Sequence, residues 1–193
     1  QSRFVVIVKE VPAWNPVFYT RGVTVAVVGT RRNPREALDP NIKGGNYLNN
    51  VLGITEARAA GADDCLMLSE DGFITEASNS NVFFVIDGEL STPSQKAANL
   101  RGLTKAAIHE ACKANGLATR ETEIAAADAL GASECFLSSA TREVMPVHTL
   151  RMEDGSARTF PEGGGAITRR VRGYYREHVA RYVREHAALS LWL

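Results

Sequence analysis

The stretch Asn81-Val-Phe-Phe-Val-Ile-Asp-Gly-Glu-Leu90 decides the fold class, because it joins an apolar strand to a turn signal. Its first part, Asn81–Ile86, is rich in β-branched and aromatic residues, which is typical of a buried strand. Asp87-Gly88 follows at once, and this dipeptide is a strong signal for a two-residue hairpin turn. The chain is therefore expected to contain a β-sheet that includes this hairpin.

Other apolar runs predict further strands on both sides of the hairpin. The predicted strands are Phe4–Val8, Val23–Val28, Cys65–Leu68 and Glu134–Leu137. The first of them begins close to the first residue, which is not Met, so we expect that a preceding part of the fold is absent. The segment Gly29–Pro40 is polar and contains prolines, and we expect it to be a loop.

Apolar residues at helical spacing predict helices between these strands. The expected helices are Leu48–Ala59, Leu103–Ala114, a short one at 125–130, and a long final helix after Gly163-Gly-Gly165. The residues at helical spacing are Leu48, Val51, Leu52, Thr55 and Ala59 in the first helix, Leu103, Ala106, Ala107 and Ala111 in the second, and Ile167, Val171, Tyr174, Tyr175 and Val179 in the last. Strands mixed with helices indicate an α/β (α+β) fold.

The composition argues against several classes of function. The 193 residues include 22 Lys and Arg against 22 Asp and Glu, so the chain lacks the basic excess that general nucleic-acid binding needs. No apolar run approaches the roughly 20 residues that span a bilayer, so no membrane is expected as a partner. Cys65, Cys112 and Cys135 are far apart in sequence, which argues against a disulfide framework or a metal site and favours a reducing, cytoplasmic setting.

Two charged residues lie in segments that suit a ligand as well as a loop. Lys43 precedes a Gly-Gly pair, where the backbone allows a ligand to approach closely, and a lysine amine in an apolar pocket can form a Schiff base. Taken alone, such a lysine is usually a surface charge. Glu76 precedes a small polar turn before the strand Asn81–Ile86, where it is either a turn residue or an anion placed against a cationic ring nitrogen.

Two further segments offer groups for an anion. Gly102-Leu-Thr104 begins a predicted helix, and the free N–H groups and positive dipole end of a helix start favour a phosphate. An ordinary helix start is the alternative interpretation. The hydroxyl residues between Ser138 and Thr141 follow a predicted strand and either bind an oxyanion or merely end that strand.

The combination is more informative than any one segment. A lysine, a carboxylate and a phosphate-binding helix start, in this order, are the parts that a pyridoxal 5′-phosphate site needs. The lysine bonds to the aldehyde, the carboxylate keeps the ring nitrogen protonated, and the helix start holds the phosphate. Lys43, Glu76 and Gly102–Thr104 therefore predict a site for this cofactor.

Several spaced motifs, in matching order, resemble the fold-type IV pyridoxal-phosphate enzymes, the class IV aminotransferases. This family includes branched-chain and D-amino-acid aminotransferases and aminodeoxychorismate lyases. The resemblance runs from about Leu38 to Val147, and the stretches that carry it are Lys43–Asn49, Glu56–Asp63, Gly72–Phe83, Thr92-Pro93, Leu100–Thr104 and Ser138–Val147.

The resemblance also implies a division of the chain. Residues 41–193 correspond to the pyridoxal-phosphate-binding large C-terminal domain of the D-amino-acid aminotransferase-like fold. Residues 1–40 correspond to the interdomain linker and the first strands of that domain. The small N-terminal domain of the family, which supplies an arginine for the cofactor phosphate, is expected to be missing.

Carried over residue by residue, the resemblance implies a catalytic role for Lys43, which would form the aldimine and move a proton between substrate and cofactor. Glu76 corresponds to the partner of the pyridine nitrogen, and Tyr47 to a tyrosine near the phenolic oxygen of the cofactor. The other cofactor-binding residues implied are Leu100 on the ring face, Gly102, Leu103 and Thr104 at the phosphate, and Ser139, Ala140 and Thr141 in a second phosphate loop. Ala140 and Thr141 would also bind the substrate carboxylate.

Two departures from the family patterns concern the substrate. Asn46 lies three residues after Lys43, as in the D-amino-acid and lyase groups, whereas the branched-chain enzymes usually have this asparagine one residue later. The Gly-Thr-Ala-Ala-Glu pattern common in branched-chain enzymes is replaced by Ser139-Ala-Thr-Arg-Glu143, in which Arg142 has no assigned counterpart.

The activity implied is that of a transaminase, which moves an amino group between an amino acid and a 2-oxo acid. Branched-chain L-amino acids are slightly favoured as substrates, and D-amino acids are the nearest alternative. A lyase that releases pyruvate from aminodeoxychorismate on the same scaffold, or an inactive fragment of the fold, would also account for the motifs. The resemblance further implies a homodimer with its active site near the subunit interface.

Overall fold

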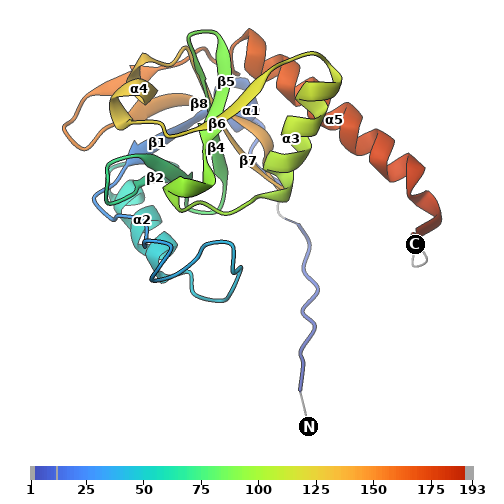
Figure 1. Ribbon diagram of the computed structural model, residues 1–193, viewed down its shortest axis with the longest axis horizontal. Coiled ribbons are helices and arrows are strands. Elements are labelled where there is room, and N and C mark those ends of the chain that lie inside the picture. The colour runs from blue at the N-terminus through green and yellow to red at the C-terminus, as the bar shows by residue number, and fades with distance from the viewer. Residues whose placement is uncertain (1–2, 12, 190–193) are drawn as a thin grey trace.

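The sheet predicted from the Asn81–Leu90 hairpin forms the centre of the protein, and helices surround it (Figure 1). The structure is a computed structural model that describes residues 3–11 and 13–189. Its strands are β1 (Val23–Val27), β2 (Asp64–Leu68), β3 (Ile74–Ala77), β4 (Asn81–Ile86), β5 (Glu89–Pro93), β6 (Thr119–Thr122), β7 (Glu134–Ser139), β8 (Glu143–Arg151) and β9 (Ala157–Thr159). Its α-helices are α1 (Val17–Thr20), α2 (Leu48–Ala59), α3 (Leu103–Ala114), α4 (Ala126–Gly131) and α5 (Ala166–Glu185), with short 3-10 helices at Gln95–Ala97 and Ala187–Leu189.

The predicted hairpin is confirmed. β4 pairs antiparallel with β5, with Ile86 opposite Glu89. The two turn residues, Asp87 and Gly88, both have positive φ, at 51° and 79°, as a type I′ turn requires. The strand order is β3-β2-β1-β8-β7-β4-β5-β6, with β9 beside β8, and the pairs β1–β2, β1–β8 and β5–β6 are parallel. The mixed sheet agrees with the predicted α/β (α+β) class.

The sheet curls until its two ends approach each other. The N–H of Ile74, at the start of β3, donates to the carbonyl of Ile124 over 2.8 Å, and Phe73 forms a bridge with Ala125 beside α4. The enclosed space is filled by buried apolar side chains, among them Val25, Leu66, Phe84, Leu137 and Met145. Removing these side chains from water is the main stabilising contribution to the fold.

The other face of β4 and β7 packs against α3 and α5. Phe83 and Phe136 stack there with ring centroids 4.8 Å apart, in one apolar cluster with Ile108 of α3. Side chains alternate between the two faces of a strand, so residues two positions away share a face. Asn81 on β4 and Ser138 on β7 therefore lie on the α3 side of the sheet, at the end where both strands approach the start of α3.

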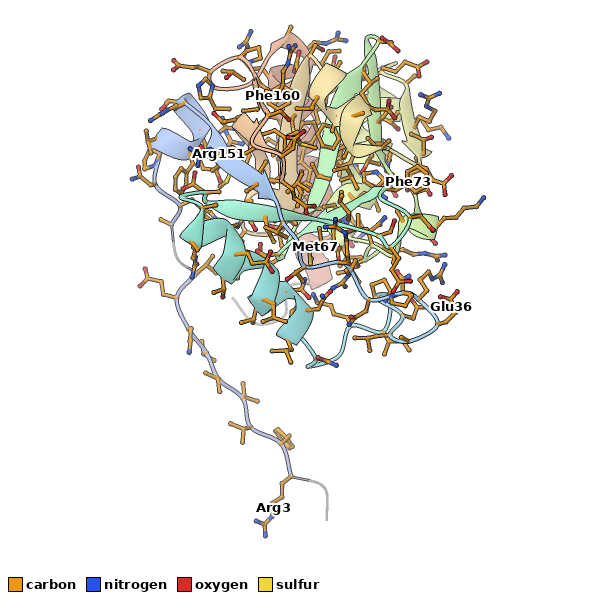
Figure 2. The ribbon with its side chains drawn as sticks, turned by 90° about the vertical axis from the view of Figure 1, so that its left-hand side faces the viewer. Arg3, Glu36, Met67, Phe73, Arg151 and Phe160 are labelled. Carbon is orange, nitrogen blue, oxygen red and sulfur yellow. The ribbon has the colours of Figure 1, made fainter. Side chains whose placement is uncertain are left out.

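Phe4–Val8 does not form the predicted strand. These residues pair with none of the described strands, and their side chains are between 73% and 90% exposed. The segment runs away from the rest of the protein, and Arg3 lies at its far end (Figures 1 and 2). The prediction is wrong because a strand needs a hydrogen-bonding neighbour, and no strand in the described part of the chain lies beside this segment.

The helix α2 is confirmed, but the large apolar residues Leu48, Val51 and Leu52 point outward. Gly53 and Ala57 face the sheet, where a Cβ on Gly53 would lie only 3.1 Å from the Sγ of Cys65 (Figure 2 labels the neighbouring Met67). Such close packing leaves room only for small residues. The larger residues Leu48, Val51 and Leu52 are 65%, 53% and 51% exposed.

The predicted apolar face of α3 is also wrong in part. Ala111 is buried as predicted, together with Ile108 and Cys112, whereas Leu103 is 88% exposed and Ala106 is also exposed. Leu103 lies in the first turn of the helix, where its side chain points away from the apolar cluster around Ile108. The spacing therefore predicted the helix correctly, but it did not predict that the side chain of Leu103 is exposed.

The final helix, α5, follows Gly165 as predicted. Val171 and Tyr175 are buried against the sheet, whereas Val179 is 38% exposed. The C-terminal part of α5 extends past the sheet (Figure 1). Within the described residues, no helix combines the length and the apolar character that crossing a membrane requires.

The strand β8 has no counterpart in the predicted pattern, because Pro146 interrupts it. A proline cannot donate to a neighbouring strand and usually excludes a central position in a sheet. Pairing of β8 with β1 begins at Val147, after the proline, so β1 needs no N–H from Pro146. The missing donor therefore does not prevent β8 from lying between β1 and β7.

A buried ion pair ties the β7–β8 turn to β2. The Nη1 of Arg142 lies 2.5 Å from the Oδ2 of Asp64, and the two side chains are 6% and 1% exposed. The other carboxylate oxygen, Oδ1, accepts the N–H groups of Cys65 and Ser78. The Arg142 guanidinium also stacks over the Trp14 ring, 4.7 Å from its centroid. Arg142, which the sequence left without a role, thus joins three segments.

We expect Arg142→Met to lower the free energy of unfolding by about 3–5 kcal/mol, because it leaves the Asp64 carboxylate buried without its cation. The matched control is Arg176→Met, since Arg176 pairs with Glu143 at the surface, where the side chains are 54% and 37% exposed. The control is expected to cost less than about 1 kcal/mol. Urea unfolding of both variants measures the difference, and equal losses would contradict the structural role of the buried pair.

Candidate functional site

A cavity of about 400 Å³ opens at the end of the sheet where β3, β4 and β7 meet the start of α3. Its walls come from the loop 38–47, the start of α2, the β3–β4 turn, residues 100–104 and the end of β7. The predicted site residues that line it are Lys43, Tyr47, Glu76, Leu100, Gly102, Leu103, Thr104, Ser139 and Ala140. Residues from four distant parts of the sequence are thus brought together in one cavity.

Thr141 is the predicted residue that the structure does not bring to this cavity. It is exposed and lines a separate hollow with Trp14 and Tyr19. The Oγ of Ser139 accepts the N–H of Arg142 over 3.3 Å, which closes the turn after β7. Ala140 in this turn still lines the cavity, whereas Thr141 lines the separate hollow. A role for Thr141 in ligand binding stays a prediction.

Lys43 and Tyr47 lie together at the rim of the cavity. The Nζ of Lys43 donates to the hydroxyl oxygen of Tyr47 over 3.1 Å. Lys43 belongs to the loop before α2, and Tyr47 is the residue that immediately precedes this helix. Both side chains are exposed, so the amine is accessible from outside the protein.

Glu76 forms the buried, acidic part of the cavity. It is 6% exposed and projects from β3. Its Oε1 lies 2.9 Å from the Nη2 of Arg32, and its Oε2 accepts the N–H of Leu100 over 2.9 Å. Burial raises the pKa of Glu76 above its ordinary value, while the Arg32 guanidinium and the Leu100 N–H oppose this shift. Each oxygen retains a second acceptor position.

Arg32 is a component of the site that the sequence did not reveal. Besides Glu76, its guanidinium donates to the Oδ1 of Asn50 over 2.9 Å and to the carbonyl of Ala98 over 3.3 Å. These contacts connect α2, β3 and the segment before α3. Arg32 lies in a polar loop without any periodic pattern, so no local signal distinguishes it from a surface arginine.

The start of α3 is held by contacts from two other segments. The Nδ2 of Asn81 donates to the carbonyl of Leu100 over 2.9 Å, and the Oδ1 of Asn41 accepts the N–H of Arg101 over 3.0 Å. A Cβ on Gly102 would overlap the Oδ1 of Asn81. The sequence suggested that Gly102 allows a ligand to approach the backbone closely. In the structure, the group that lies close to Gly102 is the side chain of Asn81.

The first N–H groups of α3 face a different environment from those of α5. At α5, the Glu134 carboxylate accepts the N–H groups of Ile167 and Thr168 over 3.0 and 2.7 Å. At α3 no side chain of the described residues caps the helix start, and the cavity lies beside Leu103 and Thr104. The uncapped donors and the helix dipole make this end of the cavity suitable for an anion.

The cavity thus combines an accessible amine, a buried carboxylate and an uncapped helix start. A ligand that fits these groups carries an electrophilic carbon, a basic ring nitrogen and an anionic group. Pyridoxal 5′-phosphate has all three, and the residues present fit it because Glu76 has acceptor positions to spare and the donors of α3 are uncapped.

Comparisons with known proteins agree on one family. Residues 1–150 match the family model described as amino-transferase class IV. A branched-chain-amino-acid aminotransferase-like protein from Arabidopsis thaliana is 32% identical over 167 residues, which cover 85% of this chain and 29% of that protein. The chain spans half or less of the length of the curated relatives that it matches in this comparison.

Two solved structures show the same relationship in three dimensions. The branched-chain aminotransferase of Thermoproteus uzoniensis, crystallised with norvaline, superposes with a TM-score of 0.74 at 31% identity over 81% of this chain and 51% of that chain. The branched-chain amino acid aminotransferase of Thermobaculum terrenum, in its form with pyridoxal 5′-phosphate, superposes with a TM-score of 0.74 at 30% identity over 86% of this chain and 53% of that chain.

Proposed function

The chain belongs to the class IV aminotransferase family, and on this premise we propose that it binds pyridoxal 5′-phosphate and transfers an amino group between an amino acid and a 2-oxo acid. The observation that carries the proposal is the cavity in which Lys43, Glu76 and the start of α3 meet. These are the three groups that the sequence pattern predicts for the cofactor site.

Lys43 is proposed as the catalytic residue. Bound pyridoxal 5′-phosphate supplies an aldehyde that bonds to an amine and a ring that withdraws electrons from it. The Nζ of Lys43 is the amine at the rim of the cavity; it would bind the cofactor there and, as a free amine, could move a proton to and from the substrate. The hydroxyl of Tyr47 accepts a hydrogen bond from this amine over 3.1 Å, and Tyr47 is proposed to lie near the phenolic oxygen of the cofactor.

Glu76 is proposed to hold a proton on the ring nitrogen. Its two oxygens are fixed by Arg32 and by the N–H of Leu100, so the carboxylate cannot turn away from the cavity. The same contact fixes Leu100, whose side chain is proposed to pack on the ring. The phosphate is assigned to Gly102–Thr104, with the turn Ser139–Thr141 as its second contact.

The substrate class is proposed from the relatives. The similar proteins are named as branched-chain aminotransferases, which supports branched-chain L-amino acids as donors. The position of Asn46 keeps D-amino acids as the alternative within the transaminases. Aminodeoxychorismate lyase activity is a second candidate, and the two are separated by transfer to 2-oxoglutarate or pyruvate against release of pyruvate from aminodeoxychorismate.

A homodimer is also proposed, and the outward face of α2 supports it. Leu48, Val51 and Leu52 form an apolar strip on this helix, continued by Tyr47 at 43% exposure. An exposed apolar patch of this kind marks an interaction surface. It adjoins the rim of the cavity through Tyr47, which would place the active site near the interface.

Borohydride reduction of the protein with pyridoxal 5′-phosphate is expected to leave a covalent label on Lys43. Mass spectrometry of the labelled peptides locates the label, and the protein is assayed in parallel for transfer from L-leucine to 2-oxoglutarate. Lys43→Ala is expected to lose both the label and the transfer. The control Lys113→Ala, an exposed lysine on α3, should keep both. A label on a different residue would refute the proposed role of Lys43.

Glu76→Gln is expected to slow turnover by at least about 100-fold while leaving cofactor binding measurable. The amide oxygen can still accept the N–H of Leu100, but a neutral amide cannot keep the ring nitrogen protonated. Steady-state kinetics at saturating cofactor measures kcat. The matched control is Glu89→Gln, whose carboxylate pairs with Arg120 at the surface. Unchanged turnover in Glu76→Gln would show that the carboxylate has another role.

The combined substitution Leu48→Glu and Val51→Glu is expected to convert the dimer into a monomer, because it places charges in the apolar strip of α2. Light scattering coupled to gel filtration measures the molar mass. Val183→Glu, which alters an exposed apolar residue on α5, is the control and should leave the dimer intact. A wild-type protein that is monomeric at micromolar concentration would contradict the proposed interface.

A further inference from the structure

We propose that the hydroxyl of Ser138 donates a hydrogen bond to the phosphate of the bound cofactor, as a binding residue additional to those assigned above. The inference rests on the proposed function, since it requires pyridoxal 5′-phosphate in the cavity. Three observations support it: the position of Ser138 in the sheet, its pairing with Asn81, which contacts the residues just before α3, and its unpaired buried hydroxyl.

The position of Ser138 follows from the register of two strands. Ser138 on β7 lies directly opposite Asn81 on β4. Residues directly opposite each other in an antiparallel pair point their side chains to the same face, with Cβ atoms about 4.5–5.5 Å apart. The next pair on this face is Phe83 and Phe136, which stack under α3. The Ser138 hydroxyl therefore lies on the α3 side of the sheet.

Asn81 connects this position to the start of α3. Its Nδ2 donates to the carbonyl of Leu100, and its Oδ1 fills the space beside Gly102. Ser138 is thus the immediate neighbour of the side chain that holds Leu100 and Gly102 in place. Ser138 and the residues Gly102–Thr104 line the same cavity, so Ser138 lies at the end of the cavity where the free backbone donors of α3 are found.

The Ser138 hydroxyl lacks a partner within the described part of the protein. The residue is 2% exposed, and its Oγ forms no hydrogen bond there. Buried hydroxyls elsewhere in the sheet are satisfied by neighbouring carbonyls, as for Thr75 with Met67 over 2.8 Å and Thr92 with Val82 over 2.7 Å. An unpaired buried hydroxyl is unfavourable, and when its residue lines a cavity it points to a ligand that pairs with it.

The chemistry of a phosphate matches this arrangement. A phosphate monoester presents three acceptor oxygens, whereas the N–H groups of Leu103 and Thr104 account for only part of their capacity. A serine hydroxyl supplies a further donor and rotates freely to reach an acceptor. Ala140, near the same strand end, has no hydroxyl to offer. Ser138 therefore supplies a side-chain donor at this end of the cavity in addition to Thr104 and Ser139.

The test compares two cofactor forms and two serine variants. Pyridoxal 5′-phosphate and pyridoxal, which lacks the phosphate, are titrated into wild-type protein, Ser138→Ala and Ser91→Ala, and binding is followed by visible absorbance. Ser91 is the matched control, because its hydroxyl is also unpaired among the described residues and the residue is 0% exposed, but it lies on β5 away from the cavity. Thermal unfolding of the unliganded variants verifies that each is folded.

Ser138→Ala is expected to bind pyridoxal 5′-phosphate about tenfold more weakly than wild type, with the affinity for pyridoxal unchanged. Ser91→Ala is expected to match wild type with both compounds. An unchanged preference for the phosphorylated form in Ser138→Ala would overturn the inference and leave the proposed function intact. Equal losses in both serine variants would also overturn it. Failure of wild-type protein to bind pyridoxal 5′-phosphate would overturn the proposed function and the inference together.

Discussion

The fixed position of the Leu100 peptide is the constraint on which the cavity depends. Glu76 accepts its N–H, and Asn81 donates to its carbonyl, so this residue's backbone is held from both sides by side chains of β3 and β4. This double contact sets where α3 begins and keeps its first donors directed at the cavity. It also holds the Glu76 carboxylate in one orientation. Loss of either contact would affect both Glu76 and the uncapped start of α3.

The middle of the sheet is filled by an apolar core, whereas one end of the sheet contains buried ion pairs. Arg32 pairs with Glu76 and Arg142 pairs with Asp64, and in each pair the two side chains are at most 10% exposed. Burying a charge is costly unless it is paired and hydrogen-bonded, and these four groups have partners on several segments. The polar end of the sheet is therefore specific in its geometry, because few other arrangements would satisfy the same charges. Such preorganised surroundings would suit the charged cofactor proposed for the cavity.

Much of the fold could be predicted from local patterns. The hairpin at Asp87-Gly88 and the bounds of α2 and α3 follow from signals that involve only a few neighbouring residues. The errors occur where distant segments decide the outcome. Phe4–Val8 has the composition of a strand but no neighbouring strand among the described residues, and β8 forms in spite of Pro146 because β1 and β7 accept it between them.

The sequence by itself determined the order of the chemical groups: an amine at Lys43, a carboxylate at Glu76 and a helix start at Gly102. These signals are local, because each depends on a residue type and its immediate neighbours. Only the tertiary structure decided that Arg32 pairs with Glu76 and that Arg142 pairs with the buried Asp64. It also decided that Ser138 lies near the start of α3 and that its hydroxyl has no partner within the described residues. Those features depend on contacts between residues far apart in the chain, which no local pattern of charge or hydropathy encodes.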